Sequence, residues 1–216
     1  MKNITLILQK LKEENKDYFK KEDVKEIVKR IEKDFKISFN WASVWTYLRQ
    51  QRYFTLLIKG HYLFLPKKDD RQLNYETTVD RKLCSLLEKI GIDWYIGLDS
   101  ALKIHKEKWQ YSKKTVIVNS NITGKRKIGN RDYIFRLVRG KHFVDKSLIK
   151  IDYMKVSTLE KTILDIIYFS RYDRKNMDYV LQEVKELLKK TNLKEVLKLS
   201  KSYPKTVQND ITRSIG

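Results

Sequence analysis

The sequence predicts an α+β fold in two domains, and three observations lead to this prediction. Apolar side chains recur at helical spacing through the first 50 residues, and short runs of β-branched and aromatic residues follow from residue 54. Strand-like and helical stretches then alternate up to residue 157, after which the apolar spacing is helical. A polar run after Pro66 separates the two parts. We therefore expect one domain over 1–68 and a second, mixed α+β domain with a helical C-terminal tail over 74–216.

Three helices are expected at the start of the first domain. Apolar spacing predicts helices over 4–13 and 22–35. A third helix begins after Ser38 or Asn40, either of which can accept the first N–H groups of a helix. This third helix presents an apolar stripe to the other two, formed by Trp41, Val44, Trp45 and Leu48.

A β-hairpin is expected after the third helix. Residues 54–58 and 61–65 are short β-prone runs, and the two residues between them, Lys59 and Gly60, suit a tight turn. Three helices followed by a hairpin within about 65 residues is the arrangement of a winged helix-turn-helix domain. We expect that fold for the first domain.

The second domain is expected to mix helices with strands. Asp99 is a candidate cap for a short helix, and Ser157-x-x-Glu160 matches a capping box at the start of an apolar one. In chain order we expect a helix over 75–90, an extended stretch over 93–97, a helix over 100–106, strands over 115–119 and 133–138 joined by a connection over 121–132, a strand over 148–156, and helices over 159–169, over 177–190 and from Asn192.

The charge of the chain indicates a polyanionic partner. Its 47 basic and 27 acidic side chains give a formal net charge of +20. Residues 100–150 hold 14 basic and three acidic side chains, so the positive charge is concentrated there. Such a surface binds nucleic acid by releasing the counterions of phosphate groups. The alternative is a lysine-rich surface without a partner.

No apolar run approaches the 18–20 residues of a membrane span, and the N-terminus lacks a signal-peptide pattern, so we expect a cytoplasmic protein without a membrane partner.

The first domain carries the residues expected to read double-stranded DNA. Burying the apolar stripe of the third helix leaves its opposite face for the major groove. No acidic residue occurs between Asp34 and Asp69, so no carboxylate there repels phosphate. Tyr47 can equally belong to the core, and a protein-binding winged helix is the alternative for the domain. The candidate DNA contacts are Asn40, Ser43, Thr46, Tyr47, Arg49, Gln50, Arg52, Lys59 and His61.

A second basic group lies in and beside the connection over 121–132. Carboxylates are scarce around it, so we expect it to extend the contact with DNA. The alternative is a solvated hairpin loop without a partner. The members of the group are Lys113, Lys114, Lys125, Arg126, Lys127 and Arg131.

The sequence offers no pattern of catalytic or metal-binding residues. It lacks Asp-x-Asp, the kind of carboxylate cluster that holds Mg²⁺ in nucleases and nucleotidyltransferases. Asp80-x-Lys82 and Glu183-x-Lys185 match an acid-x-Lys nuclease pattern, but both lie on expected helices. The histidines are scattered, and the single cysteine, Cys84, lies on an apolar stripe and cannot form a disulfide within the chain. We therefore expect no metal, no cofactor and no enzymatic activity.

Three segments together match a known pattern. Tyr95-Ile96-Gly97 is followed by Ser100-Ala101-Leu102-x-x-His105, and residues 156–165 read Val-Ser-Thr-Leu-Glu-Lys-Thr-Ile-Leu-Asp. In the first domain, Leu48-Arg49 leads to Lys59-Gly60-His61-Tyr62. With these segments the chain resembles the AbiEi family, the DNA-binding antitoxins of type IV toxin–antitoxin (abortive infection) systems. The likeness spans about 40–170. Lys106 stands where the family usually has Gly, and Leu159 where it usually has Pro, so the chain resembles a divergent member.

The resemblance implies a transcriptional repressor that binds the promoter of its own operon and neutralises a nucleotidyltransferase-like toxin. It also implies that the two proteins form no stable complex. Self-association on DNA is a further expectation, for which repeated half-sites would be the sign. Two alternatives remain: a nucleic-acid enzyme with a divergent nuclease domain, and an architectural protein that binds all DNA sequences alike.

Overall fold

The computed structural model describes residues 2–58, 60–65, 75–107, 114–138 and 147–215. Over these residues the chain forms nine helices and two β-sheets, which confirms the α+β class. Its contacts define two compact units, Met1–Ile90 with Lys127–Asn130, and Gly91–Arg126 with Arg131–Gly216. No helix in the described part of the chain is both long and apolar enough to span a membrane.

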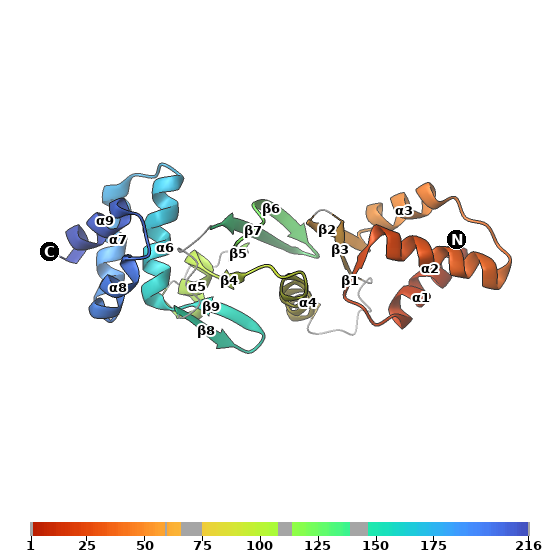
Figure 1. The fold of residues 1–216 in the computed structure, drawn as a ribbon, viewed down its shortest axis with the longest axis horizontal. Coiled ribbons are helices and arrows are strands. Elements are labelled where there is room, and N and C mark those ends of the chain that lie inside the picture. The colour runs from red at the N-terminus through yellow and green to blue at the C-terminus, as the bar shows by residue number, and fades with distance from the viewer. Residues whose placement is uncertain (1, 59, 66–74, 108–113, 139–146, 216) are drawn as a thin grey trace. The chain divides into compact units, whose positions relative to one another are not determined.

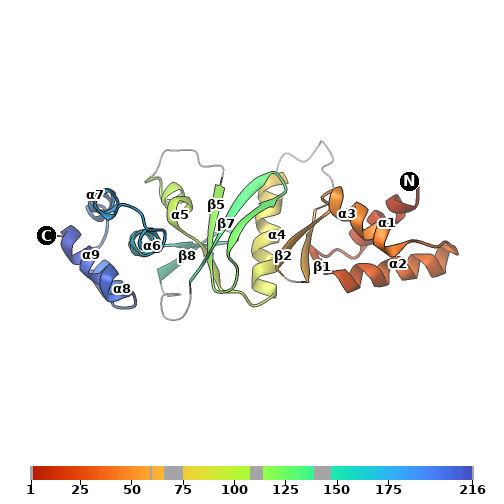
Figure 2. The ribbon, with the colours of Figure 1, turned by 90° about the horizontal axis from the view of Figure 1, so that it is seen from above.

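The first unit combines helices with a three-stranded antiparallel sheet (Figures 1 and 2). The strand order is β1-β3-β2, so β3, the last of these three strands along the chain, lies between β1 and β2. The elements are α1 (Lys2–Glu13), β1 (Tyr18–Lys20), α2 (Lys21–Phe35), α3 (Trp41–Gln50), β2 (Phe54–Ile58), β3 (His61–Phe64) and α4 (Tyr75–Lys89).

Helix α4 groups with the first unit by its contacts. Lys82 on α4 forms an ion pair with Asp17 at 3.1 Å, and the Lys89 ammonium lies 5.7 Å from the centre of the Tyr18 ring. The sequence places this helix in the second domain, since the polar run comes before it. The domain division between residues 68 and 74 stays a prediction.

Strand β1 is absent from the elements expected from the sequence. Phe19 at its centre is fully buried, and its ring lies edge-on against Phe54 at 5.9 Å and Phe64 at 5.6 Å. Three residues are too few to show the alternation of a strand, and the partner strand β3 is distant along the chain. The contact that holds β1 is therefore tertiary.

Local contacts close helix α2 at both ends. At its start the Lys20 N–H donates to the Asp23 carboxylate at 2.8 Å, and at its end Lys36 adopts a left-handed φ of 53°. Its buried residues recur at helical spacing and pack with Ile7 and Leu11 of α1 in one core; they are Val24, Ile27, Val28 and Ile31.

A six-stranded mixed sheet, ordered β6-β7-β5-β4-β9-β8, belongs to the second unit apart from the end of β6, which groups with the first unit. The pairs β5–β7 and β4–β9 are parallel, while β4–β5 and β8–β9 are antiparallel. The elements are β4 (Trp94–Ile96), α5 (Leu98–Ile104), β5 (Lys114–Asn119), β6 (Gly124–Ile128), β7 (Arg131–Leu137), β8 (Leu148–Ile151), β9 (Met154–Ser157), α6 (Leu159–Tyr172), α7 (Met177–Leu188), α8 (Leu193–Ser200) and α9 (Lys205–Ile215).

Two expectations for this sheet are wrong. Residues 121–132, expected as a connection, contain strand β6, which turns into β7 at Gly129 (φ 60°) and Asn130. Residues 148–156, expected as one strand, form the hairpin β8–β9, which turns at Asp152 with a left-handed φ of 54°. Aspartate tolerates this conformation better than most residues, so the turn needs no glycine and is hard to detect from the sequence.

Two expected helix caps are also replaced by neighbouring residues. Helix α6 is capped by Thr158, whose hydroxyl accepts the Lys161 N–H at 3.3 Å, whereas Ser157 ends strand β9. The N-cap of α5 is Gly97, and Asp99 lies within its first turn. The first shift follows from β9, which continues one residue further than expected, and the second from α5, which begins two residues earlier than expected.

The helical tail packs around α6. Figure 1 shows α7, α8 and α9 gathered about this helix, and Ile163, Leu164 and Ile167 of α6 are fully buried among them. Asn176 and Asn192 cap α7 and α8, and each accepts backbone N–H groups from the first turn of its helix. Helix α9, which closes the group, has no separate counterpart in the sequence prediction.

Candidate nucleic-acid interface

Helix α3 is held in the first unit by the apolar face that the sequence predicts. Val44, Trp45 and Leu48 are buried. The Trp45 ring packs edge-on against Tyr62 at 4.9 Å and lies at a tilt against Phe54 at 5.5 Å, so the helix is anchored on both strands of the hairpin. Trp41 is only half-buried and stacks on Trp45 at 5.6 Å.

Asn40 starts this helix, which settles the choice between the two expected caps. Its side-chain oxygen accepts the Ser43 N–H at 3.0 Å. The arrangement satisfies one of the N–H groups that a helix start leaves without a partner. Asn40 and Ser43 are both exposed, so this end of the helix faces solvent.

The opposite face of α3 is exposed, as the helical period requires. Tyr47, the residue for which a core position was the alternative, is half-buried and packs against the core while keeping part of its surface in solvent. The exposed residues of this face and of the turn after it are Asn40, Ser43, Thr46, Arg49, Gln50 and Arg52.

Of the two candidate DNA contacts on the hairpin, the structure describes only His61. His61 is half-buried, with its ring 6.2 Å from that of Tyr18, and Gly60 adopts a φ of 81° at the turn. Lys59 lies outside the described residues. Since the sequence has no carboxylate from residue 35 to 68, α3 and the hairpin carry only basic or neutral side chains.

The second basic group lies on three strands of the large sheet. Lys125 and Lys127 alternate with Arg126 along the edge strand β6, so the two lysines share one face and are exposed, while Arg126 is half-buried. Lys114 begins β5 and is exposed, and Arg131 begins β7 and is half-buried. Lys113 lies outside the described residues. Lysines on an edge strand also discourage pairing with other chains, so their position fits a protective role as well as a binding one.

Two of the three segments behind the AbiEi resemblance, residues 95–105 and 156–165, contact one another inside the second unit. The His105 Nε2–H donates to the Ser157 carbonyl at 2.8 Å, and the Ser157 hydroxyl lies 2.7 Å from that of Thr162. Gly97 is required by close packing, because a Cβ there would lie 2.8 Å from a methyl of Val118. These residues thus hold β4, α5, β9 and α6 together.

A buried ionic network joins the same helix to the tail. The Asp165 carboxylate accepts hydrogen bonds from Tyr95 at 2.8 Å and Tyr203 at 2.6 Å, and the Lys161 ammonium lies 3.5 Å from it. Lys161 and Asp165 are 1% and 0% exposed, so no ligand reaches them. Burial, with the neighbouring carboxylate second, raises the pKa of Tyr95 and of Tyr203 well above the usual value. The network is closed on itself and serves the fold.

The described residues contain no group of three or more His, Cys, Asp or Glu placed to hold a metal ion. The acid-x-Lys pairs at Asp80 and Glu183 lie on helices α4 and α7, as expected. Cys84 is buried, and burial raises the pKa of its thiol far above the ordinary value, which disfavours the reactive thiolate. The absence of enzymatic activity stays a prediction.

Comparisons with known proteins give a likeness of fold. No family model matches the chain, and no curated protein does. The crystal structure of the Rv2827c protein from Mycobacterium tuberculosis is similar with a TM-score of 0.54 and 12% identity, over 97% of this chain and 74% of that one. The solution structure of the antibiotic-resistance factor ANT(2'')-Ia is similar with a TM-score of 0.37 and 8% identity, over 65% of this chain and 94% of that one. The second value is too low to support an argument, and the first indicates a fold shared with Rv2827c.

Proposed function

We propose that this chain is a sequence-specific DNA-binding repressor that inserts α3 into the major groove. The observation that carries the proposal is the division of α3 into a buried apolar face and an exposed face that has hydrogen-bonding groups, one arginine and no carboxylate. A helix with those properties meets the requirements of groove recognition, since base edges and phosphates both accept hydrogen bonds from such side chains.

The elements around α3 support a winged helix-turn-helix. The order is helix, strand, two helices and a hairpin, with the hairpin strand β3 paired to β1 in one sheet. In this interpretation the β2–β3 turn is the wing and contacts the backbone beside the groove. Lys125 and Lys127, exposed on β6, would add contacts with phosphate that do not depend on sequence.

The physiological role that we propose follows from the resemblance to the AbiEi family. The chain would repress its own operon and oppose a nucleotidyltransferase-like toxin encoded beside it, without a stable complex between the two. Repression rests on the α3 surface, whereas the antitoxin role rests on the resemblance alone. The two parts of the proposal therefore need separate experiments.

Footprinting on the DNA upstream of its own gene, with unrelated DNA as competitor, tests the repressor. A discrete protected site is expected, and Arg49→Ala should weaken binding to it by about 1–3 kcal/mol, because a guanidinium contact to a base or phosphate is lost. Lys29→Ala is the matched control: it removes one exposed positive charge from α2 and should leave the affinity nearly unchanged. Equal losses in both variants would show that only net charge matters.

Neutralising Lys125 and Lys127 together should weaken binding to every DNA sequence alike. Each phosphate contact that is lost should also reduce the slope of log affinity against log salt by about one. Unchanged affinity at low salt would remove β6 from the interface.

Equal affinity of the unmodified protein for all sequences would favour the architectural alternative, and Mg²⁺-dependent cleavage of plasmid DNA would favour the nuclease.

A further inference from the structure

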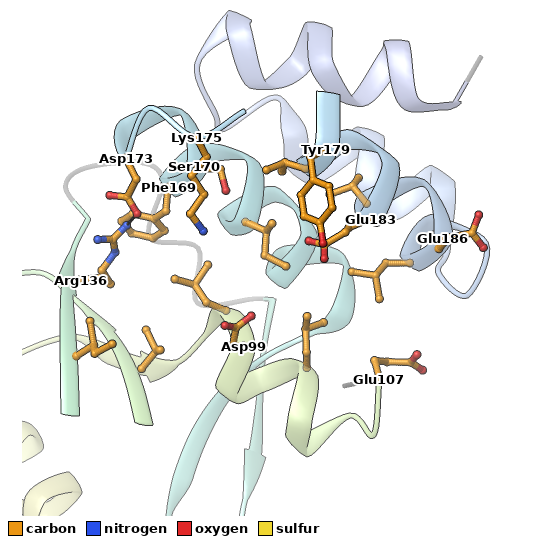
Figure 3. Close-up of a pocket in the computed structure, with 18 of the residues that line it drawn as sticks. Asp99, Glu107, Arg136, Phe169, Ser170, Asp173, Lys175, Tyr179, Glu183 and Glu186 are labelled. Carbon is orange, nitrogen blue, oxygen red and sulfur yellow. Dashed lines mark hydrogen bonds and ion pairs between the residues drawn. The ribbon is translucent and has the colours of Figure 1, made fainter. Parts of the chain in front are cut away.

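A pocket of about 650 Å³ lies within the second unit, among α5, strands β5 and β7, and helices α6 and α7 (Figure 3). Its volume falls in the range of sites for small organic molecules, roughly 300–1,000 Å³. A ligand with an apolar body suits the lining, because filling the pocket removes apolar surface from water. The apolar side chains of the lining come from all five elements and are Leu98, Leu102, Val116, Ile134, Ile166, Phe169, Val180, Val184 and Leu187.

Most of the charged side chains around the pocket are neutralised by ion pairs. Five of the eight charged residues in the lining have a partner of opposite sign. Figure 3 shows Arg136 and Asp173 at one end of the pocket, and Glu107 and Glu186 at the other, so the apolar part lies between them. The pairs are Arg136 with Asp173, Lys190 with Glu107 at 2.6 Å, and Glu186 with Lys189, a residue outside the lining, at 2.7 Å.

The three remaining charged residues select neither cations nor anions. Lys175 and Glu183 are exposed and carry opposite charges, and neither forms an ion pair with another residue that the structure describes. Asp99 is also exposed and already has an interaction partner. A charged ligand would therefore lose hydration on entering the apolar lining, and no excess of opposite charge would compensate that loss.

Tyr179 provides a neutral polar group at the mouth of the pocket. It is 63% exposed, and Figure 3 shows its ring above the pocket. A tyrosine combines an apolar ring with a hydroxyl, so it suits the end of a ligand that stays in contact with water. Phe169, in contrast, is 5% exposed, and the Arg136 guanidinium lies 4.8 Å from the centre of its ring. The polar end of a ligand is therefore expected at Tyr179 and its apolar end inside.

We infer that this pocket binds an uncharged small molecule with a mainly apolar body and a hydroxyl or amide group at one end. The body lies against Ile134, Ile166 and Val184, and the polar end stays at the mouth beside Tyr179. The inference goes beyond the proposed function and does not depend on DNA binding.

Three probes with one apolar body and different charges test the proposal: phenylbutanol, phenylbutylamine and phenylbutanoate. In titration calorimetry on the full chain, at an ionic strength that screens its net charge, the alcohol should bind at least as tightly as either charged probe. A charged probe that binds more tightly than the alcohol would overturn the proposal, and so would the absence of any binding.

A second pair of probes tests the apolar body by its size. Naphthylethanol should bind at least about threefold more tightly than phenylethanol, because its second ring buries more apolar area. Amide shifts in NMR should change mainly on α5, β5, β7, α6 and α7. Equal affinity for the two alcohols, or shifts elsewhere in the chain, would refute the assignment to this pocket.

Two variants of the lining and two matched controls locate the site. Ile134→Trp fills the pocket from β7 and should weaken phenylbutanol at least about tenfold, whereas Ile166→Ala removes contacts without filling it and should weaken this alcohol about two- to tenfold. Ile151 lies on β8 outside the lining and is 37% exposed, so Ile151→Trp and Ile151→Ala should leave the affinity unchanged. Circular dichroism checks that each variant is folded. Equal losses in the lining variants and in their controls would refute the site.

Discussion

Replacing Tyr203 with phenylalanine deletes one hydroxyl from the buried network of the second unit and should lower its free energy of unfolding by about 1.5–3 kcal/mol. The hydroxyl donates to Asp165 at 2.6 Å and lies 3.0 Å from the Lys161 ammonium, so both of its partners carry charge. Hydrogen bonds to charged groups are worth more than neutral ones. Lys161, Asp165 and Tyr95 keep their mutual contacts, so the loss stays below the roughly 3–5 kcal/mol of breaking a buried ion pair.

The same variant should change how stability depends on alkaline pH. Burial raises the pKa of Tyr95 and of Tyr203 well above 10.0, the value that governs the unfolded chain. The folded state therefore keeps protons that the unfolded state loses, so their contribution is complete below pH 10.0 and falls as the pH rises further. Each tyrosine accounts for about 1.4 kcal/mol per pH unit. Tyr203→Phe should halve this part of the slope.

Urea unfolding followed by circular dichroism, at neutral and at alkaline pH, measures both effects. Tyr172→Phe is the matched control, because Tyr172 on α6 is 78% exposed and its hydroxyl should contribute less than about 0.5 kcal/mol. A Tyr203→Phe protein as stable as the parent at neutral pH, with the same alkaline slope, would refute the reasoning that this network stabilises the unit.

Three further changes test single contacts. Gly97→Ala should destabilise the second unit by about 1–3 kcal/mol, since the new methyl would meet Val118 at 2.8 Å, and an unchanged melting temperature would contradict that packing. Asn40→Ala should cost about 1 kcal/mol of stability by removing the α3 cap, which calorimetry measures. Asn40→Asp should keep the cap but weaken DNA binding by adding a carboxylate, which a gel-shift assay measures. The Cys84 thiol, whose pKa burial raises, should react with iodoacetamide only as fast as the chain unfolds, so rapid labelling without denaturant would show it to be accessible.

Long periodic helices were the most predictable part of this fold. Helix α2 shows its apolar stripe and its acidic first turn in the sequence, and α3 shows which face is buried. Short strands were not predictable in the same way. Strand β1 has three residues, and β6 alternates lysine with arginine, so neither has the apolar alternation of a half-buried strand. The one local signal for β6 was the Gly129-Asn130 pair, which suits a two-residue hairpin turn.

The candidate sites also differ in how far the sequence predicts them. The exposed face of α3 follows from the period of one helix, so the sequence was sufficient to propose it. The pocket is assembled from α5, β5, β7, α6 and α7, and its lining runs from Leu98 to Lys190. No local pattern marks Ile134 or Val184 as neighbours of one cavity, because their proximity arises only when the helical tail packs onto the sheet.

The contacts of the AbiEi-like segments separate what the resemblance supports from what it leaves to experiment. Ser157 bonds to both His105 and Thr162 inside the second unit, and Asp165 belongs to the buried network of that unit. Contacts of this kind serve folding whatever the protein binds, so the resemblance supports a shared fold more strongly than a shared activity. The proposed protection against a toxin must therefore be tested apart from the proposed operator binding. An Arg49→Ala protein that no longer binds its operator but still protects cells from the toxin would assign repression to the first unit and protection to the second.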